Sequence, residues 1–600
     1  MKKRKLISLL LTGALGLSLL AGCTPGTPKE TGSPAPAGAY KAGTYSATAD
    51  GNNGPVKVEV TVSDSAITDV KVVEQAETAS IAGPALERIP AAIKDNQSLG
   101  IDAVTGATVT STAILTAVAD CVTQAGGDAE ALKKVPVKKN EGEAVGDMTA
   151  DVVIIGAGGA GLSAAVEAKD AGAGTVVLLE KMAAIGGTTF TSQGVIGGYG
   201  TNIAKKLNVE VSYEDMYANL MSNASYRLDP ALTAITVGKS GETIDWLQDR
   251  VGMPFADEIR VGYGPLQMMH VIEGAGEGMN TAFSKAIADA GVNLMLETEA
   301  TEILMNADGS VAGVKAVKGG QEMTISAKSV VVATGGYAYN PELTALLTPE
   351  LAGTYGIGFP GSTGEGIIMA SNVGAALSHT DDMMCVLKDY EIMSEHNGNS
   401  ATANNFGFMA LPNMILVGAA GTRFVNEKDQ GYMTQALNSP IFDQMHKDNL
   451  GYVWAISDQA AVDASGRTKR GMDLPFITAN TPAELAALMG VDAAGLEKTI
   501  NDFNSYVDAG YDKEFRRTGE ELSKLTAPYV AVAQVPCEII TYGGIARNEK
   551  AEVIRADGTS IPGLFTAGEA SANSAYMGFT LSNCFTWGRI AGAGAANYAK

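Results

Sequence analysis

Two hydrophobic patterns occupy the N-terminal part of the chain. Apolar and polar residues alternate with a period of two over 43–51 and 56–74, which is typical of half-buried antiparallel strands. Apolar residues recur at helical spacing over 86–96 and 111–122. Residues 40–128 are therefore predicted to form a small α+β domain.

A different pattern follows a segment without apolar periodicity. Residues 133–149 are charged and contain glycine, and we predict a linker over 129–149. Beyond it, DVVII (151–155) is an apolar run that suits a buried strand, and TVVLLE (175–180) suits a second one after a helix. This strand–helix–strand order indicates an α/β unit with parallel strands.

The first residues have the pattern of an export signal, with a basic start, an apolar stretch and small residues up to Cys23. The apolar stretch is shorter than the ~20 residues that a membrane span needs. LAGC (20–23) resembles a bacterial lipobox, which implies that 1–23 is a lipoprotein signal peptide and that Cys23 is lipidated. Residues 24–39 suit a disordered tether, so we expect the protein on the extracytoplasmic face of the cell membrane.

Composition limits the remaining possibilities. The 600 residues, 46% of them apolar, are enough for two or more domains with their own cores, and the net charge of −23 argues against a nucleic acid partner. The cysteines beyond Cys23 are scattered without a CxxC, so no disulfide framework, c-type haem or iron–sulfur cluster is expected. Because the four histidines have no ligand spacing, no metal site is predicted.

The turn after the 151–155 strand carries a dinucleotide-binding pattern. Gly156, Gly158 and Gly161 form G-x-G-x-x-G at the start of a helix, and Glu180 stands 24 positions after Gly156. The glycines would let a pyrophosphate approach the helix N-terminus, and Glu180 would accept hydrogen bonds from a ribose. NAD and FAD both fit this unit.

The run IDAVTGATVTSTA (101–113) gives the N-terminal domain a candidate function. With GTY (43–45) and ETAS (77–80) it resembles the FMN-binding domain of sodium-pumping quinone reductase subunits and extracytoplasmic flavin reductases. The resemblance implies that a flavin transferase, reading Asp102, Thr105 and Gly106, joins FMN through its phosphate to a threonine hydroxyl. The family pattern points to Thr108, with Thr110 as the alternative. Small residues and a helix start would suit the phosphate.

A second resemblance covers residues 150–600. Its motifs are GGTT (186–189), SVVVATGGY (329–337), STGEGI (362–367), GTRFVNE (421–427), IPGLFTAGEAS (561–571) and WGRIAG (587–592). They resemble the flavoprotein subunits of the fumarate reductase and succinate dehydrogenase group, especially the flavocytochrome c-type and urocanate reductase branch. The resemblance implies non-covalent FAD on an α/β Rossmann-like domain (150–380 and 539–600), with an inserted mobile α+β capping domain (381–538).

Motif positions give the expected FAD-binding residues. They are Gly156, Gly158, Gly159, Gly161, Glu180, Lys181, Gly186, Gly187, Thr188, Thr189, Gly194, Ala333, Thr334, Gly335, Gly336, Gly364, Gly366, Gly568, Glu569 and Ser582. His270 is expected to support this site without taking part in chemistry.

The substrate residues of fumarate reductases are not matched. Gly431 or Tyr432 stands where their proton-delivering arginine would fall, and Ile540 or Thr541 replaces a clamping histidine. A second arginine is absent from 573–584 and a further histidine from 385–391. A dicarboxylate would therefore be buried without partners, which is costly.

Aromatic residues replace this clamp: Tyr432, Tyr542, Tyr576, Met577 and Phe579. Flavin-dependent 3-ketosteroid dehydrogenases, which are similar in the FAD region, use tyrosines to hold a ketone and move a proton. By this resemblance Tyr432, Tyr576 and Tyr542 are the candidate catalytic residues, with Tyr432 as the proton donor.

Together these features predict an extracytoplasmic reductase of an activated C=C bond in an enone or enoate. Electrons would pass from a membrane donor, quinol- or flavin-linked, through covalent FMN to FAD and on to a small-molecule acceptor. Three alternatives remain: a fumarate- or urocanate-type dicarboxylate reductase, a 3-ketosteroid dehydrogenase-like enzyme, and a non-catalytic electron-transfer lipoprotein.

Overall fold

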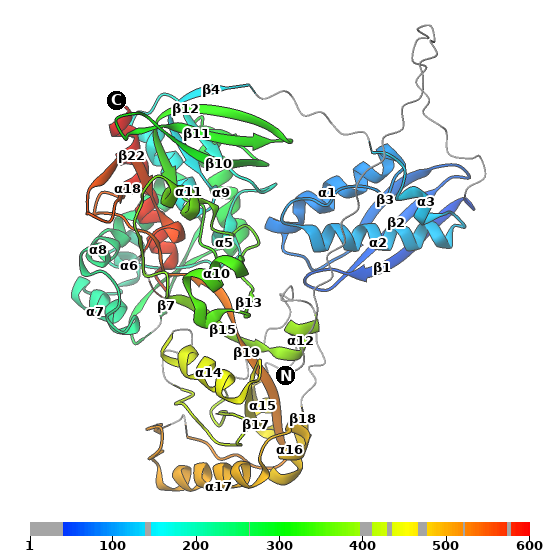
Figure 1. The fold of residues 1–600 in the computed structure, drawn as a ribbon, viewed down its shortest axis with the longest axis vertical. Coiled ribbons are helices and arrows are strands. Elements are labelled where there is room, and N and C mark those ends of the chain that lie inside the picture. The colour runs from blue at the N-terminus through cyan, green and yellow to red at the C-terminus, as the bar shows by residue number, and fades with distance from the viewer. Residues whose placement is uncertain are drawn as a thin grey trace, which may run out of the picture.

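The structure is a computed structural model that describes residues 40–137, 146–262, 264–395, 411–428, 435–465, 477–519, 522–572, 576 and 578–600. The predicted signal peptide with Cys23, the tether, Tyr432 and Met577 lie outside the described residues. In Figure 1 the described chain forms an N-terminal domain (blue), a core domain (cyan to green, and red) and a cap (yellow to orange). None of the described helices is both long and apolar enough to cross a membrane.

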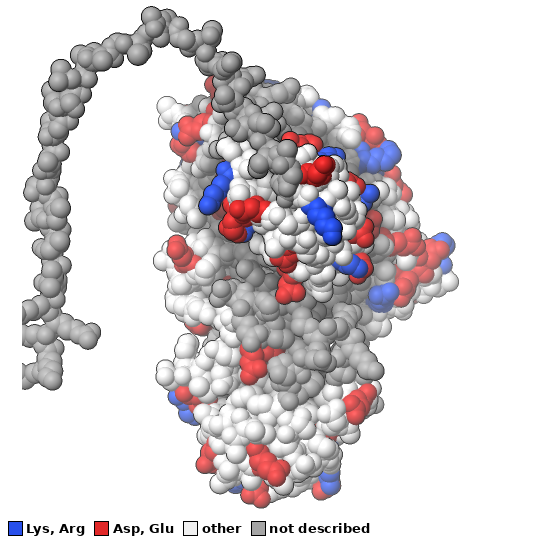
Figure 2. Space-filling view, turned by 90° about the vertical axis from the view of Figure 1, so that its right-hand side faces the viewer, with Lys and Arg blue, Asp and Glu red and all other residues white. Residues whose placement is uncertain are grey.

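The N-terminal domain is a three-stranded sheet covered by helices, as its periodicity predicts. Strands β1 (Gly43–Asp50), β2 (Pro55–Val62) and β3 (Ile67–Glu74) pair in antiparallel order. Helices α1 (Ala79–Asn96) and α2 (Thr108–Gln124) follow. Alternate residues of β2 (Val56, Val58, Val60 and Val62) are buried in the core beneath them. Figure 2, in which this domain faces the viewer, shows acidic and basic side chains interspersed over it.

The predicted linker contains a short helix that belongs to this domain. Helix α3 (Ala129–Leu132) packs back on the loop after α1, where the Leu99 N–H donates to the Leu132 carbonyl at 3.1 Å. The Ser98 hydroxyl donates to the Val135 carbonyl at 2.8 Å. The domain therefore reaches at least Val135, and the following strand β4 already begins at Met148.

The core domain is built on an eight-stranded sheet in the order β10-β11-β12-β4-β5-β9, with β22 beside β12 and β21 beside β22. The neighbours β22, β12, β4, β5 and β9 run parallel. Their bounds are β4 (Met148–Ile155), β5 (Val176–Leu179), β9 (Asn293–Met295), β10 (Thr298–Met305), β11 (Val311–Lys318), β12 (Gln321–Val332), β21 (Glu552–Ile554) and β22 (Ser560–Thr566). The end of β4 is buried, as expected for a parallel strand covered on both faces.

The core domain also contains helices. They are α4 (Gly159–Asp170), α5 (Gly187–Phe190), α6 (Asn202–Leu207), α7 (Tyr213–Asn223), α8 (Pro230–Trp246), α9 (Ala275–Asp289), α10 (Pro341–Leu347), α11 (Glu365–Asn372) and α18 (Thr580–Ala599), with short helical turns η1 (Leu247–Val251), η2 (Pro349–Leu351) and η4 (Gly568–Ala570). Helix α18 packs along α4. The C-terminal helix therefore lies beside the helix that follows the predicted dinucleotide-binding turn. A small sheet of β6 (Val195–Gly197), β7 (Phe255–Val261) and β8 (Gln267–Ile272), and a pair of β14 (Leu377–Ser378) and β20 (Gly544–Ile545), complete the domain.

The cap is a separate α+β unit on strand β19 (Tyr529–Thr541), which leads back into the core domain. Its other strands are β13 (Tyr355–Gly356), β15 (Met383–Asp389), β16 (Ile415–Val417), β17 (Val453–Asp458) and β18 (Ile477–Ala479). Its helices are α12 (Tyr390–Glu395), α14 (Gln435–Asp448), α15 (Gln459–Ser465), α16 (Pro482–Met489) and α17 (Ala493–Ala509).

The GTRFVNE motif lies inside the cap and has a structural role there. The buried Arg423 side chain donates twice to Glu427, at 2.7 Å each, and contacts Asp512 at 2.9 Å. Arg517 donates to the same Glu427 carboxylate at 3.0 Å. Because buried charges are tolerated only when paired in this way, the motif holds the interior of the cap.

Candidate functional site

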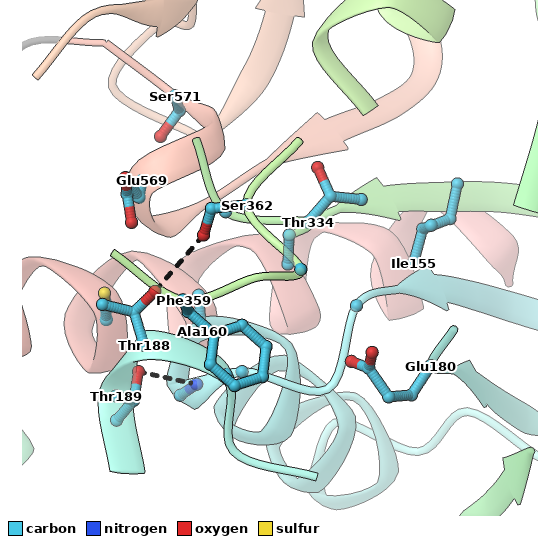
Figure 3. A pocket seen from close by; sticks show the side chains of 18 of the residues that line it. Ile155, Ala160, Glu180, Thr188, Thr189, Thr334, Phe359, Ser362, Glu569 and Ser571 are labelled. Atoms are coloured by element: carbon cyan, nitrogen blue, oxygen red, sulfur yellow. Dashed lines mark hydrogen bonds between the residues drawn. The ribbon is translucent and has the colours of Figure 1, made fainter. Parts of the chain in front are cut away.

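A cleft lies at the carboxyl ends of the parallel strands and opens to solvent. Ile155, Glu180 and Ala333, each at or just after the end of β4, β5 or β12, line it. Ligands of open α/β sheets bind at this edge. Figure 3 shows Glu180 at one end of the cleft and Ser571 with Glu569 at the other.

The glycine turn after β4 keeps this edge open. Gly156 has φ +99°, and a Cβ there would lie 2.5 Å from the Ala333 carbonyl oxygen. A Cβ on Gly161 would lie 1.8 Å from the Gly156 carbonyl oxygen, so α4 can approach the strand only through glycine. The start of α4 consequently lines the cleft at Gly158, Gly159 and Ala160, where a helix N-terminus can bind a pyrophosphate.

Two buried carboxyl groups stand at opposite ends. Glu180 accepts hydrogen bonds from the Ala157 N–H at 2.8 Å and the Met182 N–H at 2.9 Å, and burial raises its pKa. Glu569 accepts from the Thr541 N–H at 3.0 Å, and burial raises its pKa to about 7. Each is fixed by backbone donors and can also accept from the hydroxyl groups of a bound sugar or sugar alcohol.

Most of the predicted cofactor residues line this cleft. They are Gly156, Gly158, Gly159, Glu180, Lys181, Gly187, Thr188, Thr189, Ala333, Thr334, Gly335 and Glu569. The Thr189 hydroxyl accepts from the Gly159 N–H at 3.1 Å, and the hydroxyl groups of Thr188 and Ser362 are hydrogen-bonded to each other at 3.3 Å (Figure 3). The buried Thr334 hydroxyl has no hydrogen-bond partner in the described part of the chain, so a ligand could satisfy it.

The other predicted positions do not line the cleft. They are Gly161, Gly186, Gly194, Gly336, Gly364, Gly366, Gly568 and Ser582. A Cβ at Gly336 would meet Glu569, one at Gly366 would meet Thr334, and one at Gly568 would meet Ala160. The absence of a side chain at these three glycines therefore leaves room for the lining residues Glu569, Thr334 and Ala160. Buried His270 is also outside the lining: its Nε2 contacts the Thr201 hydroxyl at 2.8 Å, and burial lowers its pKa.

Phe359 and Asn583 line the cleft but belong to no motif that marks a cofactor residue. Ser571 ends the IPGLFTAGEAS motif without having been selected, and Ile540 and Thr541 had been noted only as replacements of a histidine. Ser362 and Glu365 do lie within STGEGI, where only the glycines had been selected.

Of the candidate catalytic tyrosines, two are brought together. The rings of Tyr542 and Tyr576 stack with centroids 4.3 Å apart, and Tyr542 lines the cleft. Both are buried in one apolar cluster, which also contains Met216, Met221, Met268, Met269, Val386 and Phe579. Tyr432 lies outside the described residues.

The two candidate FMN-bearing threonines differ in environment. Thr108 is the first residue of α2 and is exposed, whereas the buried Thr110 hydroxyl donates to the Glu77 carboxylate. A phosphate on Thr108 would face the unpaired N–H groups of the helix start.

The loop 104–107, which precedes Thr108 and is called the attachment loop below, lies against the core domain. A Cβ on Gly106 would fall 2.0 Å from the Met182 side chain, and Met182 directly follows the cleft residues Glu180 and Lys181. Ala183 packs in the N-terminal domain's apolar core, and Arg88 pairs with Glu297 at 2.9 Å.

Comparison with known proteins agrees with this architecture. Residues 151–582 match the FAD binding domain family, and residues 51–123 match the FMN-binding domain family. The chain is 30% identical to a urocanate reductase of Eggerthella lenta over 97% of each protein.

Two solved structures are similar. One is the open conformation of a flavocytochrome c3 fumarate reductase, at 27% identity and a TM-score of 0.61 over 76% of this chain and 79% of that one. The other is a 3-ketosteroid-Δ4-(5α)-dehydrogenase from Rhodococcus jostii in complex with 4-androstene-3,17-dione, at 25% identity and a TM-score of 0.62 over 76% and 99%.

The fold and the cleft thus define a flavin-dependent oxidoreductase that acts on CH–CH groups. The chain belongs to the FAD-binding family that includes the fumarate and urocanate reductases, and it carries an additional FMN-binding domain. It is a reductase of C=C bonds with FAD and FMN as cofactors, not the non-catalytic carrier considered as an alternative.

Proposed function

We propose that this reductase acts on an apolar enone or enoate. The observation that carries the proposal is the stacked pair Tyr542–Tyr576 at the cleft, surrounded by the methionine-rich apolar cluster. Methionine and aromatic side chains bury apolar ligand surface and adapt to its shape. Phenolic O–H groups can polarise a single carbonyl.

The same region offers little to a dicarboxylate. Val386, in the segment where the fumarate reductase pattern has a histidine, is part of the apolar cluster, and Ile540 lines the cleft. Two carboxylates held there would lose their hydration without gaining cationic partners among these side chains.

The residues would divide the work as follows. The cleft residues would hold FAD, which would supply hydride chemistry for the β-carbon of the acceptor. Tyr542 and Tyr576 orient and polarise the carbonyl, and Tyr432 donates the proton to the α-carbon, so that the C=C bond gains one hydride and one proton.

We also propose that electrons arrive through FMN joined to Thr108 by a phosphoester. The contact of Gly106 with Met182 supports proximity of the two domains, because it brings the attachment loop beside the Glu180 end of the FAD cleft. The tethered FMN would still have to reach the opposite, Ser571 end to pass electrons to the flavin ring. The Arg88–Glu297 pair supports the same placement of the N-terminal domain.

The cellular setting remains part of the proposal. A lipid anchor on Cys23 would hold the enzyme at the extracytoplasmic face of the membrane, a flavin transferase would mature Thr108, and a quinol- or flavin-linked membrane protein would supply electrons. The basis for this is the lipobox-like sequence and the FMN-binding motif.

A second candidate function is the reduction of urocanate or fumarate. It is favoured by the match to a urocanate reductase, which extends over 97% of both chains and so includes both flavin domains.

Anaerobic reoxidation of the reduced protein distinguishes these candidates. We expect an apolar enone or a cinnamate-type enoate to oxidise it faster than urocanate or fumarate. Tyr432→Phe and Tyr576→Phe should slow enone turnover, by ~10²–10⁴-fold where a proton transfer is lost, without releasing FAD. Tyr598→Phe, an exposed tyrosine remote from the cleft lining, serves as the control. Fastest oxidation by urocanate or fumarate would establish the second candidate.

A further inference from the structure

Arg547 is a buried cation directly behind the wall of the FAD cleft. It follows strand β20 and is 4% exposed. Its guanidinium donates to the Ser571 hydroxyl and to the Asn583 side-chain oxygen at 3.5 Å, and it stacks on Trp587 with Cζ 3.9 Å from the ring centre. Ser571 and Asn583 both line the cleft, so one layer of side chains separates the charge from the ligand.

The three groups that Arg547 contacts here are neutral. Burial lowers its pKa to about 9, which leaves the group protonated at pH 7. Asp229 and Cys584 are titratable groups that act on it, and the Asp229 carboxylate favours its charged form. Asp229 caps α8, and burial raises the pKa of the Cys584 thiol to about 12, so that thiol is neutral at pH 7.

The position of Arg547 along the cleft determines what its charge can act on. In the dinucleotide fold an acidic residue at the end of the second strand binds the adenosine ribose, a role that falls to Glu180 here. Ser571 lies at the opposite end of the cleft (Figure 3). FAD with its adenosine at Glu180 would therefore extend its flavin toward Ser571 and Asn583. The N-terminus of α18, whose Thr580 and Leu581 line the cleft, adds partial positive charge at that end.

We propose that Arg547 tunes the bound FAD, raising its reduction potential and favouring the anionic form of the reduced ring. Reduction adds two electrons, and when only one proton accompanies them the ring keeps one negative charge. A fixed cation in a low-dielectric wall stabilises that charge more than it would in water. This role does not depend on which acceptor the enzyme reduces.

The test is a redox titration of the full chain with bound FAD, made in the Thr108→Val background so that FMN does not contribute. We expect Arg547→Met to lower the FAD midpoint potential and to raise the number of protons taken up per two electrons near pH 7 from one toward two. Arg547→Lys keeps the charge and should retain both properties. Arg555→Met is the matched control, because Arg555 donates to the Val373 carbonyl and neither residue lines the cleft.

Three results would overturn the proposal. The first is an FAD midpoint potential and pH dependence that are unchanged in Arg547→Met. The second is an equal change in Arg547→Lys, which would show that side-chain packing and not charge is the cause. Weaker FAD binding with an unchanged potential would assign the charge to the pyrophosphate instead. The visible spectrum of bound FAD checks that each variant is folded. Covalent FMN that persists in the Thr108→Val protein would contradict the assignment of Thr108 as the acceptor, but not the role of Arg547.

Discussion

Thr108 and Thr110 stand two positions apart in one motif, yet the fold gives their hydroxyl groups opposite environments. The helix that begins at Thr108 leaves this residue exposed and turns Thr110 inward onto Glu77. Glu77 also accepts from the Asn53 N–H at 2.8 Å, so Thr110 is part of a buried network that ties α2 to the sheet. At the scale of single residues, accessibility favours Thr108 as the acceptor.

A pair of substitutions tests this assignment. Thr108→Val should abolish the FMN that survives denaturation while leaving FAD bound. Thr110→Val should keep covalent FMN but lower stability by about 1–3 kcal/mol, because the Glu77 carboxylate loses a buried donor. Mass spectrometry of the denatured chain and thermal melting are the measurements. A phosphoryl-FMN adduct that disappears only in the Thr110 variant would reverse the assignment.

At the scale of elements, the cleft depends on how closely α4 approaches β4. A Cβ on Gly161, in α4, would lie 1.8 Å from the carbonyl oxygen of Gly156, which directly follows β4. Such a contact is far shorter than van der Waals distance, so any side chain must move the helix away from the strand. The helix start that lines the cleft would move with it.

Gly161→Ala should therefore weaken FAD binding strongly and lower the melting temperature of the core domain. Gly238→Ala is the matched control, since it lies in the exposed face of α8 and its Cβ would meet nothing closer than 3.9 Å. Alanine there should be neutral or stabilising by up to about 1 kcal/mol. Fluorescence titration with FAD and thermal melting provide the measurements, and unchanged FAD affinity in Gly161→Ala would contradict the argument.

At the scale of the whole molecule, β15 and β19 connect the cap to the core domain. Glu538 lies on β19 at this junction, where its buried carboxyl accepts hydrogen bonds from Thr344 at 3.0 Å and from Thr354. Burial raises its pKa to about 6 from the ordinary value of 4.5. The native protein thus binds this proton more tightly than the unfolded chain does.

The stabilising contribution of protonated Glu538 is full below pH 4.5 and is lost as the pH rises through 6. Glu538→Gln removes the titration but keeps an acceptor for the threonines. Between pH 4.5 and 7.5 wild type should lose about 2 kcal/mol more stability than the variant, since each pKa unit corresponds to about 1.4 kcal/mol. Melting temperatures of both proteins across this range measure the difference, and parallel curves would show that Glu538 does not titrate as described.

The sequence by itself determined the local elements and the two cofactor domains. Strands β1 to β3 and helix α2 follow from periodicity, and the β4–α4–β5 unit follows from an apolar run and three glycines. These features were predictable because the buried face of a strand or helix shows as a periodic pattern of apolar residues close together in the sequence. Motif resemblance added both cofactors, which the family matches confirm.

Only the tertiary structure decided which distant residues share the site. Ser571, Asn583 and Ile540 join Glu180 at the cleft because the sheet order and α18 bring the chain back beside α4. Ser571 ends a motif and Ile540 replaces a histidine of the fumarate reductase pattern, but neither fact placed them at the cofactor cleft. The tertiary structure alone also places Arg547 behind the cleft residues Ser571 and Asn583, and stacks Tyr542 on Tyr576. Such contacts depend on how separate segments pack, which a local pattern of apolar and polar residues does not encode.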